Sequence, residues 1–178
     1  MTDLKLDSAT IATGLLHDTI EDTYATYETI KGEFGVEVAD LVDGVTKISV
    51  LENTASTNSK AENFRKLILA TSKDIRVLLV KIADRLHNMR TIKGIDKDEK
   101  RKRISQETME IYAPLADRMG MHRIRDELED LSFEILNSDA RSLIQKRLEE
   151  IKLDKKDIFD DLSKEFKQLL SEYSIDTS

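Results

Sequence analysis

The segment between residues 73 and 92, KDIRVLLVKIADRLHNMRTI, has the clearest helical pattern in the chain. Its apolar side chains recur every three or four residues, so on a helical projection they share one face, at about 140° to 220° from Asp84. That apolar face consists of Leu79, Ile82, Leu86 and Met89. The opposite face carries a compact polar cluster, namely Asp84, His87, Asn88 and Thr91. The pattern predicts a helix that buries one side and presents polar groups on the other.

The composition favours an all-α fold for the whole chain. Only 5% of the 178 residues are aromatic, 35% are charged, and there is one proline. No stretch alternates apolar and polar residues over more than a few positions, as a half-buried strand would. Pro114 is expected to kink or end the helix that contains it. We predict further helices at residues 8–22, 27–34, 36–48, 61–72, 121–136, 138–151 and 155–173.

Charge and cysteine content exclude several kinds of site. The formal charge of −7 argues against a surface that coats a polynucleotide, although a local phosphate pocket is compatible with 28 Lys and Arg residues. The chain has no cysteine, so any metal must be held by histidine and oxygen ligands. No apolar run approaches the roughly 20 residues that span a bilayer, and the first residues lack a signal-peptide pattern. We therefore expect a cytoplasmic protein without membrane contact.

The sequence LLHDTIED at residues 15–22 is a second candidate for chemistry. In a continuous helix, His17 lies four residues before Glu21, and Asp18 lies four before Asp22. Carboxylates packed that closely would repel one another, and a divalent cation would relieve the repulsion. The residues alone leave a structural alternative open, in which the histidine is half-buried and the acidic residues form a solvated helix end. We expect Leu15 to anchor this segment on its apolar side.

Four segments, in order along the chain, resemble one enzyme family. They are GLLHDTIEDT, FGVEVADLVDGVTKIS, AENFRKLILATSKDIRVLLVKIADRLHNMRTI and YAPLADRMGMHRIRDELEDLSFEIL. Together they look like the hydrolase half of the Rel/Spo family of guanosine tetra- and pentaphosphate synthetase/hydrolases, an all-helical domain of the HD superfamily. The resemblance implies an HD-type hydrolase domain at residues 1–137. It also implies a helical connector at residues 138–178, similar to the family's link to its synthetase domain.

The resemblance further implies an activity and a set of residue roles. The family's hydrolase serves the stringent response by removing the 3′-pyrophosphate of (p)ppGpp, giving GDP or GTP and pyrophosphate, with Mn²⁺ as its cofactor. By similarity, the metal ligands are His17, Asp18 and Asp84. Glu21 and Asp22 would position or deprotonate the attacking water, while Asn88 and Thr91 would contact the nucleotide. A mixed imidazole and carboxylate set suits Mn²⁺ or a similar divalent ion.

Two histidines stay outside this assignment. His87 lies on the polar side of its helix, and we favour a structural or hydrogen-bonding role for it over that of a reserve metal ligand. His122 follows Gly120 closely, so it is expected at the surface or at a helix end. Neither residue is expected to bind the metal.

The chain departs from the family pattern at both ends. The family's HD site takes a further histidine from an upstream segment, but only 16 residues precede His17 and none of them is histidine. We therefore expect that the chain begins inside the domain. A hydrolase would then bind its metal through the three remaining ligands, or would depend on a partner chain that supplies the missing ligand or a synthetase domain. No segment carries the family's synthetase signatures, so synthesis of (p)ppGpp is not expected.

Three functional accounts stay open at this point. The chain is an active hydrolase, a catalytically inactive remnant that binds a nucleotide or a partner, or a helical interaction module whose motif is historical. Another nucleotide phosphohydrolase of the HD superfamily is the runner-up among enzymes. Metal binding, nucleotide binding and pyrophosphate release separate these accounts experimentally.

Overall fold

A computed structural model describes residues 5–54, 74–154 and 156–172. Every regular element within these ranges is a helix, which confirms the predicted all-α class. The chain divides into two units, Met1–Leu136 and Asn137–Ser178. The helix predicted at 61–72 lies outside the described residues.

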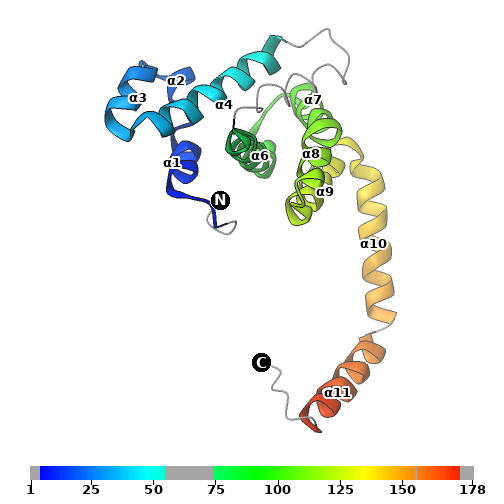
Figure 1. The fold of residues 1–178 in the computed structure, drawn as a ribbon. Coiled ribbons are helices and arrows are strands. Elements are labelled where there is room, and N and C mark those ends of the chain that lie inside the picture. The colour runs from blue at the N-terminus through cyan, green and yellow to red at the C-terminus, as the bar shows by residue number, and fades with distance from the viewer. Residues whose placement is uncertain (1–4, 55–73, 155, 173–178) are drawn as a thin grey trace. The chain divides into compact units, whose positions relative to one another are not determined.

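The larger unit begins with α1 (Ser8–Leu16), α2 (Thr19–Asp22), α3 (Tyr27–Phe34) and α4 (Val36–Thr54). The first three helices all pack against α4 (Figure 1). Apolar side chains of α3 and α4 make a small core that contains Ile30, Val38, Ala39 and Val42. Gly35 joins α3 to α4 at a φ of 88°, a conformation that glycine adopts without strain. The long helix α4 is therefore the platform on which the N-terminal segment is placed.

The prediction of one continuous helix through the LLHDTIED segment is wrong, because α1 ends before His17 and α2 begins after Asp18. Nδ1 of His17 donates to the carbonyl oxygen of Gly14 at 2.9 Å. The hydroxyl of Thr19 donates to the carbonyl oxygen of Leu16 at 2.6 Å. Local side-chain bonds of this kind compete with the helical hydrogen-bond ladder. They lie where α1 ends and the short helix α2 begins.

The anchoring role expected for Leu15 is also wrong. Its side chain is 82% exposed, whereas the next residue, Leu16, packs against the small core. Ala9 and Ala12 pack there too, so the partly buried apolar stripe of α1 has spacings of three and four residues. Leu15 lies one position off this stripe and faces solvent.

Helix α6 (Ile75–Arg90) is the central helix of the larger unit. It packs against α1 and α4, and also against α9 (His122–Leu136) (Figure 1). Three of the four predicted apolar positions are buried, and these are Ile82, Leu86 and Met89. Leu79 is only partly buried, whereas the helix buries five residues outside the predicted stripe: Val77, Leu78, Val80, Lys81 and Arg85. Because helices cover α6 from more than one direction, its buried surface is wider than a single stripe.

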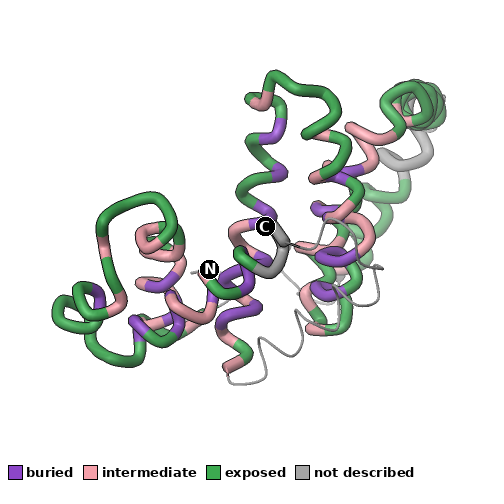
Figure 2. Tube along the Cα trace, turned by 90° about the horizontal axis from the view of Figure 1, so that it is seen from above, coloured by how far each residue is buried: buried purple, intermediate pink, exposed green. Residues whose placement is uncertain are grey.

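The rest of the larger unit is a run of helices that leads into α9. It comprises a short 3₁₀ turn (Ile92–Gly94), α7 (Asp98–Glu107), a π-helical turn (Thr108–Tyr112) and α8 (Ala113–Arg118). Pro114 does not end the helical run, because the backbone stays helical from α7 through the π-helical turn into α8. It stands in the first turn of α8, directly after the π-helical turn, where a missing N–H is tolerated. Leu128 of α9 is fully buried in the main core. Figure 2 shows buried residues, in purple, recurring at intervals along the chain between exposed ones.

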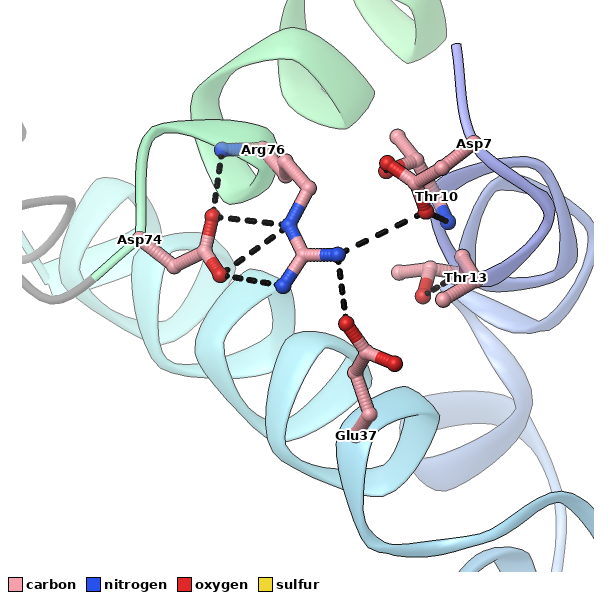
Figure 3. Close-up of polar contacts among 7 residues, drawn as sticks. Asp7, Thr10, Thr13, Glu37, Asp74 and Arg76 are labelled. Atoms are coloured by element: carbon pink, nitrogen blue, oxygen red, sulfur yellow. Dashed lines mark hydrogen bonds and ion pairs between the residues drawn. The ribbon is translucent and has the colours of Figure 1, made fainter.

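One guanidinium group ties three helix N-termini together (Figure 3). Arg76 donates at 2.7 Å both to Asp74, the N-cap of α6, and to Glu37 in the first turn of α4. Its Nη1 also lies 3.4 Å from Oδ1 of Asp7, the N-cap of α1. Acidic groups suit the positive end of a helix dipole, and the shared cation offsets their mutual repulsion. The cluster fixes the start of α1 relative to the starts of α4 and α6.

The smaller unit contains α10 (Ser138–Asp154) and α11 (Lys156–Glu172). Both helices carry exposed apolar side chains, among them Leu143, Leu148, Leu162 and Phe166. The predicted connector role of this unit stays a prediction. In the described ranges, no helix combines the length and the apolar character that crossing a membrane requires.

Candidate metal centre

His17 and Asp84 meet where α1 packs against α6. Nε2 of His17 lies 3.4 Å from Oδ1 of Asp84 and 3.0 Å from Oδ2 of Asp18. The side chains of His17 and Asp84 are 19% and 11% exposed, whereas that of Asp18 is 55% exposed. The structure thus brings together the three residues predicted as metal ligands, although they come from two distant segments of the chain.

The imidazole ring of His17 has a defined tautomer. A carbonyl oxygen only accepts hydrogen bonds, so the Nδ1 atom that contacts Gly14 must carry a proton. In the neutral ring, Nε2 therefore presents its lone pair to two carboxylates. Nε2 is buried and makes no hydrogen bond of acceptable geometry, despite the short distances to both acidic groups. This arrangement is unfavourable unless Nε2 is protonated or coordinates a cation.

Nearby charges favour a protonated His17 when no cation is bound. The contact with the Asp84 carboxylate is the main cause of a pKa of His17 above its ordinary value of 6.5, while burial acts in the opposite direction. Burial alone would raise the pKa of Asp84, but the contacts with His17 and Lys81 lower it on balance. Both shifts favour the ionised pair of His17 and Asp84, so a metal ion would have to compete with a proton on Nε2.

The donor atoms suit a divalent ion such as Mn²⁺ in kind and in spacing. Metal-bound histidines generally donate their other ring N–H to an acceptor, as His17 does to Gly14. Adjacent ligands of an octahedral ion, each at about 2.1 Å, lie about 3 Å apart. The 3.0 and 3.4 Å separations around Nε2 are close to that value. Among the residues that the structure describes, no three His, Asp or Glu side chains already form a metal site. Asp18, the most exposed donor, has the freedom to complete one.

The sequence analysis missed a buried cation beside Asp84. Nζ of Lys81 lies 3.4 Å from Oδ2 of Asp84 and 3.0 Å from the hydroxyl oxygen of Ser49 on α4. Lys81 is only 6% exposed. The available signal was its position three residues before Asp84, which places both on one side of the helix. Lysine is rarely buried, so the pattern by itself favours a solvated side chain at this position.

Glu21 and Asp22 lie on α2, directly after the helix break. Both residues are exposed, and their backbone N–H groups donate to the carbonyl oxygen of Asp18 at 3.1 and 2.9 Å. Asp18 begins α2 without capping it through its side chain, so its carboxylate is available to His17. The helical spacing predicted between His17 and Glu21 does not apply, because the break separates the two residues.

Asn88 and Thr91 are exposed near the C-terminal end of α6. Nδ2 of Asn88 donates to Oδ1 of Asp84 at 2.9 Å, so this side chain touches the candidate metal ligand. The hydroxyl of Thr91 donates to the carbonyl oxygen of His87 at 3.1 Å. The His87 side chain is exposed. His122 begins α9 with a side chain that is 65% exposed, which confirms the prediction of a surface residue at a helix end.

Comparison with known proteins identifies the family of this fold and site. Residues 1–122 match the family described as HD domain. The chain belongs to the HD-domain family. This HD domain is similar to the GTP pyrophosphokinase rsh of Brucella ovis, with 56% identity over 151 residues, which is 85% of this chain and 20% of that protein.

Two further relatives carry names that mention a hydrolase. The guanosine-3′,5′-bis(diphosphate) 3′-pyrophosphohydrolase of Haemophilus influenzae is 45% identical to this HD domain over 172 residues, which is 97% of this chain and 25% of that protein. The bifunctional (p)ppGpp synthase/hydrolase SpoT of Escherichia coli is 44% identical over 175 residues, 98% of this chain and 25% of that protein. These matches confirm the predicted resemblance to the HD domain of Rel/Spo proteins. The chain spans 20 to 25% of the length of these three relatives.

Proposed function

We propose that this HD domain hydrolyses (p)ppGpp at its 3′-pyrophosphate in a Mn²⁺-dependent reaction, releasing pyrophosphate and GDP or GTP. The observation that carries the proposal is the meeting of His17 with Asp84 and Asp18, which combines an orphaned imidazole nitrogen with two carboxylates. The names of two relatives, a 3′-pyrophosphohydrolase and a (p)ppGpp synthase/hydrolase, support the choice of substrate. The proposal assigns the protein to the cytoplasm, where such nucleotides are made and used.

His17, Asp18 and Asp84 would hold the metal ion. When bound, the ion would make water more acidic and offset negative charge on the phosphoryl oxygens. The hydrogen bond from His17 to Gly14 fixes the ring, so Nε2 keeps its direction without further ordering. Asp84 is held on the rigid helix α6, whereas Asp18 sits in the turn between two helices.

Glu21 and Asp22 would act on the attacking water. Their carboxylates are exposed on α2, one short helix from the His17–Asp18 turn, and either can accept a hydrogen bond or a proton from water. In the reaction, the water oxygen bonds to the phosphorus atom attached to the ribose 3′ oxygen. The bond between that phosphorus and the 3′ oxygen breaks, and the 3′ oxygen takes up a proton to become a hydroxyl.

Asn88 and Thr91 would bind the nucleotide at the end of α6. An amide both donates and accepts hydrogen bonds, as a guanine or ribose edge requires. Asn88 uses one donor on Asp84, which leaves its carbonyl oxygen for other contacts. Thr91 directs its hydroxyl hydrogen at a backbone carbonyl, so the oxygen lone pairs are the part that faces a ligand.

The test is pyrophosphate release from ppGpp, measured by ion chromatography with and without Mn²⁺. We expect release with Mn²⁺, none after chelation, and none in Asp84→Ala. Asp117→Ala is a matched control, because Asp117 lies in α8 and pairs with Arg125, and we expect it to retain activity. No release by the wild-type chain at high Mn²⁺ would reject the proposal.

A second candidate function is binding of (p)ppGpp, or of a partner, without turnover. The observation in its favour is that, in the described part of the chain, no three acidic or histidine side chains are already arranged around a metal position. Calorimetry with ppGpp separates the two candidates. Binding of the nucleotide together with an absence of pyrophosphate release would select the second one.

A further inference from the structure

We infer that Lys81 is a positioning residue for the metal ligand Asp84, an inference that rests on the proposed function. Lys81 contacts Oδ2 of Asp84 at 3.4 Å, while Oδ1 of the same carboxylate faces His17 at 3.4 Å and accepts from Asn88 at 2.9 Å. The two oxygens therefore have different environments. Lys81 contacts Oδ2, whereas Oδ1 faces Nε2 of His17, the atom that would bind the same metal ion.

Burying the ammonium group of Lys81 costs free energy, so its burial indicates that the charge has a role at this position. Its side chain is 8% exposed, and the hydration that a buried ammonium group loses must be compensated by an opposite charge and by hydrogen bonds. Asp84 supplies opposite charge, and the Ser49 hydroxyl, 3.0 Å from Nζ, supplies a hydrogen bond. An apolar side chain would fill the same space without the hydration cost. The protein instead has the positively charged Lys81 next to the carboxylate of Asp84, the candidate metal ligand.

The packing of α4 against α6 fixes this arrangement. A Cβ atom at Gly44 of α4 would lie 2.9 Å from Cγ2 of Val77 on α6, so the absence of a side chain lets the two helices approach closely. Further along the same interface, Ser49 of α4 meets Lys81 of α6. Both residues are buried. Because Nζ is held from two helices, it can restrict the rotation of the Asp84 carboxylate.

The direction of the effect of removing Lys81 distinguishes positioning from simple electrostatics. A lysine near a metal position repels the cation, so its removal would tighten metal binding if charge alone mattered. If Lys81 acts by orienting Asp84, its removal frees the carboxylate to rotate, and metal binding weakens. Loss of a group that orients a metal ligand typically lowers metal affinity by about 10- to 100-fold.

The experiment is calorimetric titration of the full chain with Mn²⁺ alone, for the wild type and for Lys81→Met. We expect Lys81→Met to bind Mn²⁺ about 10- to 100-fold more weakly. Lys81→Arg keeps a cation and its donors, and we expect it to recover much of the affinity. Ser49→Ala removes the second partner of Nζ and should weaken Mn²⁺ binding by a smaller factor. If Lys81→Met does not fold, Lys81→Arg and Ser49→Ala decide the question.

Arg85→Met is the matched control. Arg85 follows Asp84 in the sequence and is 8% exposed, but it pairs with Glu107 at 3.0 Å and stacks on the Tyr112 ring at 4.2 Å. We expect this variant to lower thermal stability while leaving the Mn²⁺ affinity of the folded protein unchanged. Equal or tighter binding in Lys81→Met, or unchanged binding in Ser49→Ala, would overturn the inference and leave the proposed function standing. Failure of the wild type to bind Mn²⁺ would overturn both.

Discussion

Nε2 of His17 lies 3.4 Å from Oδ1 of Asp84, although His17 ends α1 and Asp84 lies within α6. Both side chains are largely buried, and the other ring nitrogen of His17 is bonded to a backbone carbonyl. The short distance and the raised pKa of His17 both favour an ion pair between these side chains in the metal-free protein.

The first prediction concerns pH. Because the folded pKa of His17 is raised above 6.5, the His17–Asp84 interaction stabilises the metal-free protein fully below that pH, and the stabilisation is lost as pH rises through the folded pKa. We expect the stability difference between wild type and His17→Gln to be larger at about pH 6 than at about pH 8. Chemical denaturation with a chelator present measures it. An equal difference at both pH values would contradict the ion pair.

The second prediction concerns the contact between α4 and α6. Gly44→Ala should destabilise the protein by about 1–3 kcal/mol, because the new methyl group meets Val77, a stiff and buried side chain. The predicted loss is a net value, in which the steric cost exceeds the gain of roughly 1 kcal/mol in helix propensity that alanine brings. Urea denaturation measures the change. Val77→Ala in the same chain should restore part of the loss.

Gly32→Ala is the control for this prediction. Gly32 lies in α3 with no atom within 4 Å of the position that a Cβ would take. We expect this substitution to stabilise the protein by about 0.5–1 kcal/mol. Destabilisation by both alanines, to the same extent, would show that the close approach at Gly44 is not the cause.

The third prediction concerns the Arg76 cluster. Arg76→Met removes the cation that Asp74 and Glu37 share, and we expect a loss of about 1–3 kcal/mol in the free energy of unfolding. Arg90→Met is the control, since Arg90 pairs with Glu127 but is 57% exposed, and its loss should cost less than about 1 kcal/mol. Equal effects of the two variants would argue against a special role for the helix N-termini that Arg76 joins.

The fourth prediction concerns nucleotide binding. Asn88→Ala should raise the KM for ppGpp roughly tenfold, as expected for loss of a hydrogen bond to a charged or strongly polar ligand. His87→Ala, at the preceding exposed position of the same helix, should leave the KM within about twofold. Steady-state kinetics with saturating Mn²⁺ separates this effect from metal loss. A lower kcat with an unchanged KM would instead assign Asn88 to the orientation of Asp84.

Sequence periodicity correctly predicted which residues are buried in helices whose apolar stripe faces a single core. In α9, for example, Leu128 is fully buried and is flanked by partly buried Ile124 and Leu131, as their spacing indicates. Periodicity did not predict the burial pattern of α6, where Leu79 is only partly buried and Lys81 is buried. A helix covered from several directions has no single polar side, and the pattern of one segment does not contain that information.

The sequence by itself determined the helical class, because composition and apolar spacing are local properties. The resemblance of four segments to the Rel/Spo family predicted the family and the candidate metal ligands His17, Asp18 and Asp84. Only the tertiary structure decided that the helix breaks at His17, that Asp84 approaches its Nε2 atom, and that Lys81 is buried beside them. The physical reason is that each of these features depends on the packing of α1 and α4 against α6, which joins segments far apart in the chain.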